Sequence, residues 1–140
     1  MSLDRGTRIY AAVLAIICLS LLLIWMLNLD LRLEEIDDMI GRDSKIASYP
    51  YPFRALEIEG TTAVLSSPRS NAMPAVRFLG LIKPGLINLD EQDPELLAAQ
   101  KELAEIQSRV RKVVLMRNDI DRISWRLDKE WYAEKGILLQ

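Results

Sequence analysis

Residues 9–29 read IYAAVLAIICLSLLLIWMLNL, twenty-one positions without a charged side chain. As a helix that rises ~1.5 Å per residue, this stretch is about 31 Å long, enough to cross a bilayer hydrocarbon core of roughly 30 Å. The sequence therefore predicts a single N-terminal transmembrane helix, with most of the remaining chain on one side of the membrane.

The charges that flank this segment predict its orientation. Arg5 and Arg8 lie in the short tail 1–8, whereas an acidic flank begins at residue 30. The positive-inside bias keeps the two arginines in the cytoplasm, so that the span acts as an uncleaved signal-anchor. A cleaved signal peptide is disfavoured because the stretch is long and has no small-x-small cleavage site. We expect an inner (plasma) membrane protein whose residues 30–140 are extracytoplasmic, and periplasmic in a Gram-negative cell.

Composition excludes several function classes. The chain has no histidine, and its one cysteine, Cys18, lies in the span. Ser-His-Asp triads, Cys-His pairs, histidine-containing zinc sites and intramolecular disulfides are therefore ruled out. Arg5, Arg8 and Asp4 account for two of the 18 basic and one of the 20 acidic residues, which leaves 16 and 19 beyond the span and a net charge of −3. Such a domain has no electrostatic footprint for nucleic acid. No glycine-rich phosphate-binding motif occurs, and no cofactor or metal is predicted.

Apolar side chains recur with a heptad rhythm beyond the span. They are Leu29, Leu33, Ile36 and Ile40, separated by charged residues. One interpretation is a juxtamembrane helical stalk over 30–41 that forms a homodimer or pairs with a partner helix; the other is an amphipathic helix packed on its own domain or lying on the membrane surface. Gly41 is the expected end of this helix.

A linker is predicted over 42–53. It contains the run Tyr49-Pro50-Tyr51-Pro52-Phe53, in which two prolines favour an extended, stiff backbone. Its rings either cap the edge of the core or form a docking strip for a partner.

The outer domain, 54–140, begins with strand-like segments. Leu56 and Ile58 alternate with glutamates, Gly60-Thr61 marks a turn, and 62–65 continues as a second strand. The apolar run AVRFLGLI over 75–82 predicts a third strand.

A long helix is the best-specified element of this domain. Asp93 at the N-cap and Pro94 at the first helical position mark its start, and an apolar stripe continues to about Met116. A last strand over 120–127 and a short helix over 128–136 follow. The predicted fold is a small two-layer α+β domain, with an about four-stranded, mostly antiparallel sheet backed by one long helix.

The nine-residue loop from Ser66 to Pro74 is the leading candidate for a functional surface. It is long for this domain and carries Arg69, which we expect to be exposed, and Met73. The predicted partner contacts are Arg69 and Met73 of this loop, together with Leu29, Leu33, Ile36 and Ile40. The basic cluster Arg109, Arg111 and Lys112 can meet anionic headgroups or an acidic partner, although complementarity to the helix dipole is a simpler explanation.

Other polar groupings have simple explanations. Glu57 with Glu59, and Asp119 with Asp121, can do acid–base work or bind a cation, but solvated strand faces account for both pairs. A serine–lysine dyad would need a desolvated lysine, and no spacing supports one. We therefore predict no catalytic residues and no enzymatic activity.

A short cytoplasmic tail, one span and a small α+β outer domain resemble, in architecture, the bitopic accessory subunits of bacterial envelope machines. This resemblance implies a scaffold or protein-interaction role with other envelope proteins as partners. A small-molecule or lipid-sensing domain is the alternative, and a membrane-tethered enzyme is the least favoured.

Overall fold

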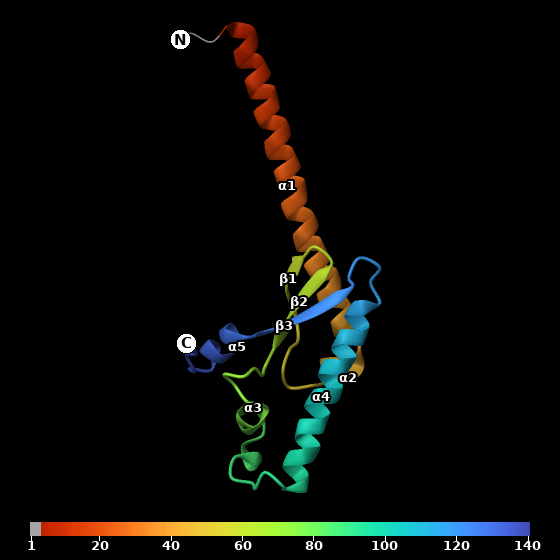
Figure 1. Cartoon of the computed structure of the whole chain (residues 1–140), viewed down its shortest axis with the longest axis vertical. Helices are drawn as coiled ribbons and strands as arrows, with labels where there is room; N and C mark the ends of the chain where they lie inside the picture. Colours follow the sequence, from red (N-terminus) through yellow and green to blue (C-terminus); the bar gives the residue numbers. More distant parts are fainter. Residues whose placement is uncertain (1–3) are drawn as a thin grey trace.

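The computed structural model describes residues 4–140, apart from the side chains of residues 29 and 30. Helix α1 (Arg5–Arg42) is a single helix of 38 residues. Its N-terminal part stands clear of the rest of the molecule (Figure 1). Among the described residues, α1 is the one helix long and apolar enough to cross a membrane, and its most apolar window, with mean hydropathy 2.7, has no buried residue.

The sheet contains three strands, β1 (Ala55–Glu59), β2 (Thr62–Ser67) and β3 (Arg122–Leu127), in the order β1-β2-β3. β1 and β2 form the predicted antiparallel hairpin, and Gly60 at its turn has φ +61°, a conformation that favours glycine. β2 and β3 are parallel. The sheet is therefore mixed and three-stranded, which corrects the prediction of about four mostly antiparallel strands.

The missing strand is the segment 75–82, which forms helix α3 (Ala75–Ile82) instead. Its buried and half-buried side chains, Ala75, Phe78, Leu79 and Ile82, follow the spacing i, i+3, i+4 and i+7 that places residues on one helix face. A short apolar run fits a buried strand and a buried helix equally well, so periodicity alone did not decide between them.

Helix α4 (Pro94–Leu115) confirms the predicted long helix. The side chain of Asp93 accepts a hydrogen bond from the backbone N–H of Glu95 at 2.9 Å, and Pro94 occupies the first turn. Together with α3 and the short 3-10 helix η1 (Pro84–Leu86), α4 forms the long crossover that a parallel pair such as β2 and β3 requires. The predicted last helix is also present as α5 (Lys129–Glu134).

The core extends into segments predicted as stalk and linker. Ile36 and Ile40 of α1 and Ile46 of α2 (Ser44–Ala47) are buried in the same cluster as the strands and α4. The rings of the linker are buried as well, and Tyr51 lies edge-on to Phe53 at 4.8 Å between ring centroids. The C-terminal part of α1 is thus an integral element of the domain.

Ion pairs join α1 and α4 side by side. Arg32 reaches Asp119, just beyond the end of α4, at 2.9 Å, whereas Asp43, at the end of α1, is paired with Arg109 at 2.6 Å. These two contacts fix an antiparallel arrangement, in which the C-terminal end of α4 lies nearer the exposed part of α1 (Figure 1).

Candidate functional site

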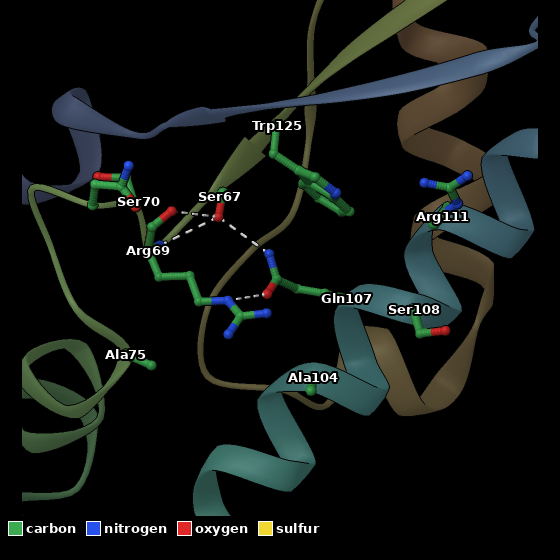
Figure 2. Close-up of a pocket in the computed structure, with 10 residues that line it drawn as sticks. Ser67, Arg69, Ser70, Ala75, Ala104, Gln107, Ser108, Arg111 and Trp125 are labelled. Carbon is green, nitrogen blue, oxygen red and sulfur yellow. Dashed lines mark hydrogen bonds between the residues drawn. The ribbon is translucent and has the colours of Figure 1, made fainter.

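A groove lies between the loop after β2, the middle of α4 and the half-buried face of β3 (Figure 2). Its volume is about 530 Å³. Its lining is mostly polar: Ser67, Arg69, Ser70, Asn71, Ala75, Ala104, Gln107, Ser108, Arg111 and Trp125. The loop is held by reciprocal backbone hydrogen bonds between Ser70 and Met73, at 2.9 and 3.2 Å. This wall of the groove therefore has a defined shape.

Buried polar groups hold the side chain of Arg69 in place. Its Nε donates to Oε1 of Gln107 at 2.6 Å, and Nε2 of Gln107 donates to Oγ of Ser67 at 3.1 Å. The Ser67 hydroxyl in turn donates to the backbone carbonyl of Arg69 at 2.9 Å, which closes the network (Figure 2). Ser67 is 2% and Gln107 7% exposed, so the exposed guanidinium rests on a buried, hydrogen-bonded base.

The groove is electropositive in a protein of net charge −2. Arg111 lies one helical turn beyond Gln107 on α4, and no aspartate or glutamate lines the groove. Within the described part of the chain, neither Arg69 nor Arg111 forms an ion pair. Two unneutralised guanidinium groups favour a negatively charged ligand.

An aromatic ring forms the floor of the groove. Trp125 of β3 is half-buried, and its ring meets Phe53 edge-on at 6.2 Å between centroids. The alternation of β3 confirms that Ile123, Trp125 and Leu127 share one face of the strand. The groove therefore combines cationic walls with a partly apolar floor, on which an apolar side chain of a ligand can pack.

The Arg69 side of the groove also influences the core below it. Burial, together with the nearby carboxylate of Glu102, raises the pKa of Tyr49 to about 12, and the positive charge of Arg69 opposes this shift. The Tyr49 hydroxyl is buried without a hydrogen-bond partner among the described residues. Tyr49 is thus a neutral group at physiological pH.

The predicted contact residues are distributed between groove and core. Arg69 is exposed and lines the groove. Ile36 and Ile40 are 0% and 3% exposed, and Met73 is 1% exposed, because their side chains fill the core. Leu33 is half-buried against the same core, and the side chain of Leu29 lies outside the described residues. Packing of the helix on its own domain therefore accounts for the apolar rhythm beyond the span.

The predicted loop is shorter than the sequence indicated. β2 continues to Ser67, and Ser66 and Ser67 are buried, so that the loop covers 68–74. Ser66 Oγ accepts a hydrogen bond from the backbone N–H of Arg54, so the Ser66 hydroxyl has a structural role. Lys83 and Lys101 are the nominal lysines for a serine–lysine dyad. Lys83 is paired with Glu102 and Lys101 with Glu105, and both side chains are exposed to solvent.

The paired carboxylates form ion pairs. Arg126 Nη2 lies 3.2 Å from Glu57 and 3.9 Å from Glu59 across the sheet. Asp119 is paired with Arg117 and Arg32, and the hydrogen bonds from Arg117 lower its pKa to about 2. No group of three or more aspartate, glutamate or cysteine side chains suited to a metal ion occurs in the part that the structure describes.

The sequence analysis did not predict Gln107 and Trp125 as groove residues, although the position of Gln107 in the sequence indicated a polar site. Gln107 lies on the apolar stripe of α4, between Leu103 and Val110, where a polar residue is unexpected. A buried glutamine on such a face needs partners, and this requirement pointed to a polar site. Trp125 gave no signal of its own, because an aromatic residue on the inner face of a strand ordinarily belongs to the core.

A smaller and more apolar groove of about 230 Å³ lies beside α3. It is lined by Met73, Val76, Arg77, Gly80, Leu81, Ile87 and Ile137.

The chain matches no protein-family model, no curated protein and no solved structure. The argument for function therefore rests on the geometry of these surfaces.

Proposed function

We propose that this protein is a non-enzymatic, single-pass membrane anchor whose extracytoplasmic domain binds another envelope protein through the groove between Arg69 and Arg111. The observation that carries the proposal is the buried Ser67–Gln107 base under an exposed arginine. Burying polar groups is costly unless their hydrogen bonds are used, and this network stabilises a surface side chain in one orientation. Preorganisation of that kind is useful for recognition, because less side-chain freedom is lost on binding.

The length and apolar composition of α1 support the proposal that this protein is anchored in a membrane. Its exposed apolar part has the length of a bilayer core, and the same helix continues without a break into the domain. We propose that residues 9–29 span the inner membrane, with the tail 1–8 in the cytoplasm. A complex at the membrane then forms between proteins that diffuse in the same plane, for which even a modest groove is sufficient.

The experiment that tests this function is photo-crosslinking in native membranes. A probe at Asn71 or Ser108, both exposed in the groove, should give a discrete adduct with a foreign protein. A probe at Glu95, exposed on the same helix about 18 Å from Gln107, is the matched control and should give none. Equal labelling from all three positions, or adducts with lipid alone, would refute the interaction module.

A ligand-sensing domain is the second candidate, favoured by the volume of the groove, which is in the range of small-ligand pockets. It predicts that a small anion raises the melting temperature of the protein in detergent. A groove that binds a protein segment predicts a shift only at millimolar or higher concentrations of a free carboxylate, which makes just one of the segment's contacts, whereas a sensor predicts a shift at micromolar ligand. Differential scanning fluorimetry with a panel of mono- and dicarboxylates separates the two.

A further inference from the structure

We infer that the groove recognises a carboxylate-bearing segment of its protein partner, with Arg69 as the fixed anchor and Arg111 as the second cationic contact. This inference rests on the proposed function and names the chemistry of the partner's segment. It also places that segment at a defined height above the membrane.

The terminal nitrogens of the Arg69 guanidinium favour a carboxylate as the group that the groove binds. Its Nε is engaged by Gln107, and no other hydrogen bond of its guanidinium occurs within the described residues. The two terminal nitrogens are therefore available for an end-on, bidentate carboxylate contact, for which the planar guanidinium is suited. Arg111 adds a second positive charge to the same groove without a competing acid in the lining.

The height of the groove argues against a lipid headgroup as the ligand. Asp43 lies 14 residues beyond Leu29, and it is paired with Arg109, at the level of the groove on α4. Measured along α1, the groove is thus about 21 Å from the end of the span. The headgroup layer takes up roughly 6 Å of this distance. The remaining distance of about 15 Å is close to two Debye lengths of roughly 8 Å at physiological ionic strength, so headgroup charges are largely screened at the groove.

The same geometry argues against a second copy of this chain. Its acidic run 34–38 lies on α1, between the span and the level of the groove, whereas its acidic segment 90–95 lies at the N-terminal end of α4, which is the end remote from the span (Figure 1). Residue 93 is 14 residues from Gln107, about 21 Å along the helix. In copies that share one membrane and one orientation, the segment 90–95 of one copy therefore lies about 21 Å farther from the membrane than the groove of the other copy.

The test combines the Asn71 probe with charge variants of the full chain in native membranes. Arg69→Gln and Arg111→Gln should each lower the yield of the foreign adduct about tenfold or more, because each removes a charged hydrogen-bond donor. Arg69→Lys keeps the charge but lacks the bidentate geometry, and we expect an intermediate yield. Arg42→Gln, which removes an exposed arginine at the end of α1, should leave the yield within about twofold.

Mapping the crosslinked partner peptide by mass spectrometry completes the test. The expected result is an aspartate or glutamate within a few residues of the crosslink. A neutral or basic segment, or a yield unchanged in both glutamine variants, would overturn the inference while the interaction module stands. If the wild-type probe gives no foreign adduct, the proposed function itself fails. Near-UV circular dichroism of each purified variant verifies that it is folded.

Discussion

Asp128 is the one buried carboxylate among the residues that the structure describes. Its side chain is 1% exposed and accepts hydrogen bonds from the Tyr51 hydroxyl at 2.8 Å, Arg54 at 2.9 Å and the backbone N–H of Trp131 at 3.1 Å. It caps α5 and fixes the linker to the C-terminal part of the chain. A buried charge of this kind is tolerable because all of its partners are present.

Removal of this carboxylate should be strongly destabilising. Asp128→Ala leaves the Tyr51 hydroxyl and the backbone N–H of Trp131 without their acceptor and removes the buried partner of Arg54, and we expect a loss of about 3 kcal/mol in the free energy of unfolding. Glu130→Ala is the matched control, because Glu130 contacts the same arginine but is 86% exposed, and should cost less than about 1 kcal/mol. Urea titration of the full chain in detergent, followed by tryptophan fluorescence, measures both. Equal losses would refute the role of Asp128.

Three buried tyrosines predict a loss of stability at alkaline pH. Burial raises the pKa of Tyr49 to about 12, and it raises the pKa of Tyr51 and Tyr132 as well. A phenol whose pKa is raised on folding stabilises the fold fully below its unfolded pKa, about 10, and that contribution is lost as the pH rises from there towards the folded value. Chemical unfolding at pH 8 to 11.5 should show a falling midpoint above pH 10.

Tyr49→Phe refines this prediction. The Tyr49 hydroxyl has no hydrogen-bond partner among the described residues, so its removal should change stability at pH 7 by less than about 1 kcal/mol. The alkaline decline should become shallower in this variant. A large loss at pH 7 would contradict the prediction and imply a partner for the hydroxyl.

At the scale of elements, α1 serves two environments along one axis. Its first part is exposed and apolar, whereas its last turns contribute Ile36 and Ile40 to the core and ion pairs to α4 and the loop after it. Ile36→Asp should therefore unfold the domain, at a cost of several kcal/mol, because it buries an unpaired charge. Asp38→Ala, at an exposed position on the same helix, is the control. Limited proteolysis of membrane-embedded protein distinguishes them; resistance of Ile36→Asp would mean that Ile36 packs elsewhere.

The ion pairs between α1 and the loop after α4 predict acid sensitivity. Hydrogen bonds from Arg117 lower the pKa of Asp119 to about 2, with burial opposing the shift. Asp119 therefore stabilises the fold above its unfolded pKa, near 3.9, and that contribution is lost as the pH falls through about 2. Asp119→Asn should flatten the decline in unfolding midpoint between pH 5 and 2, whereas Asp121→Asn, at an exposed neighbouring position, should not. An identical acid response in both variants would refute this role.

At the scale of the whole molecule, the continuous α1 places the groove at a fixed height above the proposed span. A reporter that is active only outside the cytoplasm, fused after Gln140, should be active, because Arg5 and Arg8 hold the tail inside. Arg5→Glu combined with Arg8→Glu should lower that activity, whereas Lys129→Gln, remote from the span, should not. A silent wild-type fusion would invert the proposed topology.

The amino-acid sequence by itself determined the elements whose signals are local. The apolar stretch 9–29, the Asp93-Pro94 start of α4, the turn at Gly60 and the alternation of β3 each depend on neighbours within a few residues. Helix periodicity, capping and turn conformation act at that range, and the structure contains a helix, a strand or the expected turn at each of these positions.

The tertiary structure alone decided what depends on residues far apart in the chain. The run 75–82 became a helix because its apolar face packs against η1 and α4, and β3 paired parallel with β2 because α3 and α4 intervene. The rhythm beyond the span serves the domain's own core since Ile36 and Ile40 pack there. The loop and its exposed Arg69 were predictable, but Gln107 is 38 residues away, and only folding brings it beneath that arginine. Long-range packing and hydrogen bonding, which leave no local periodicity, therefore fixed the candidate site.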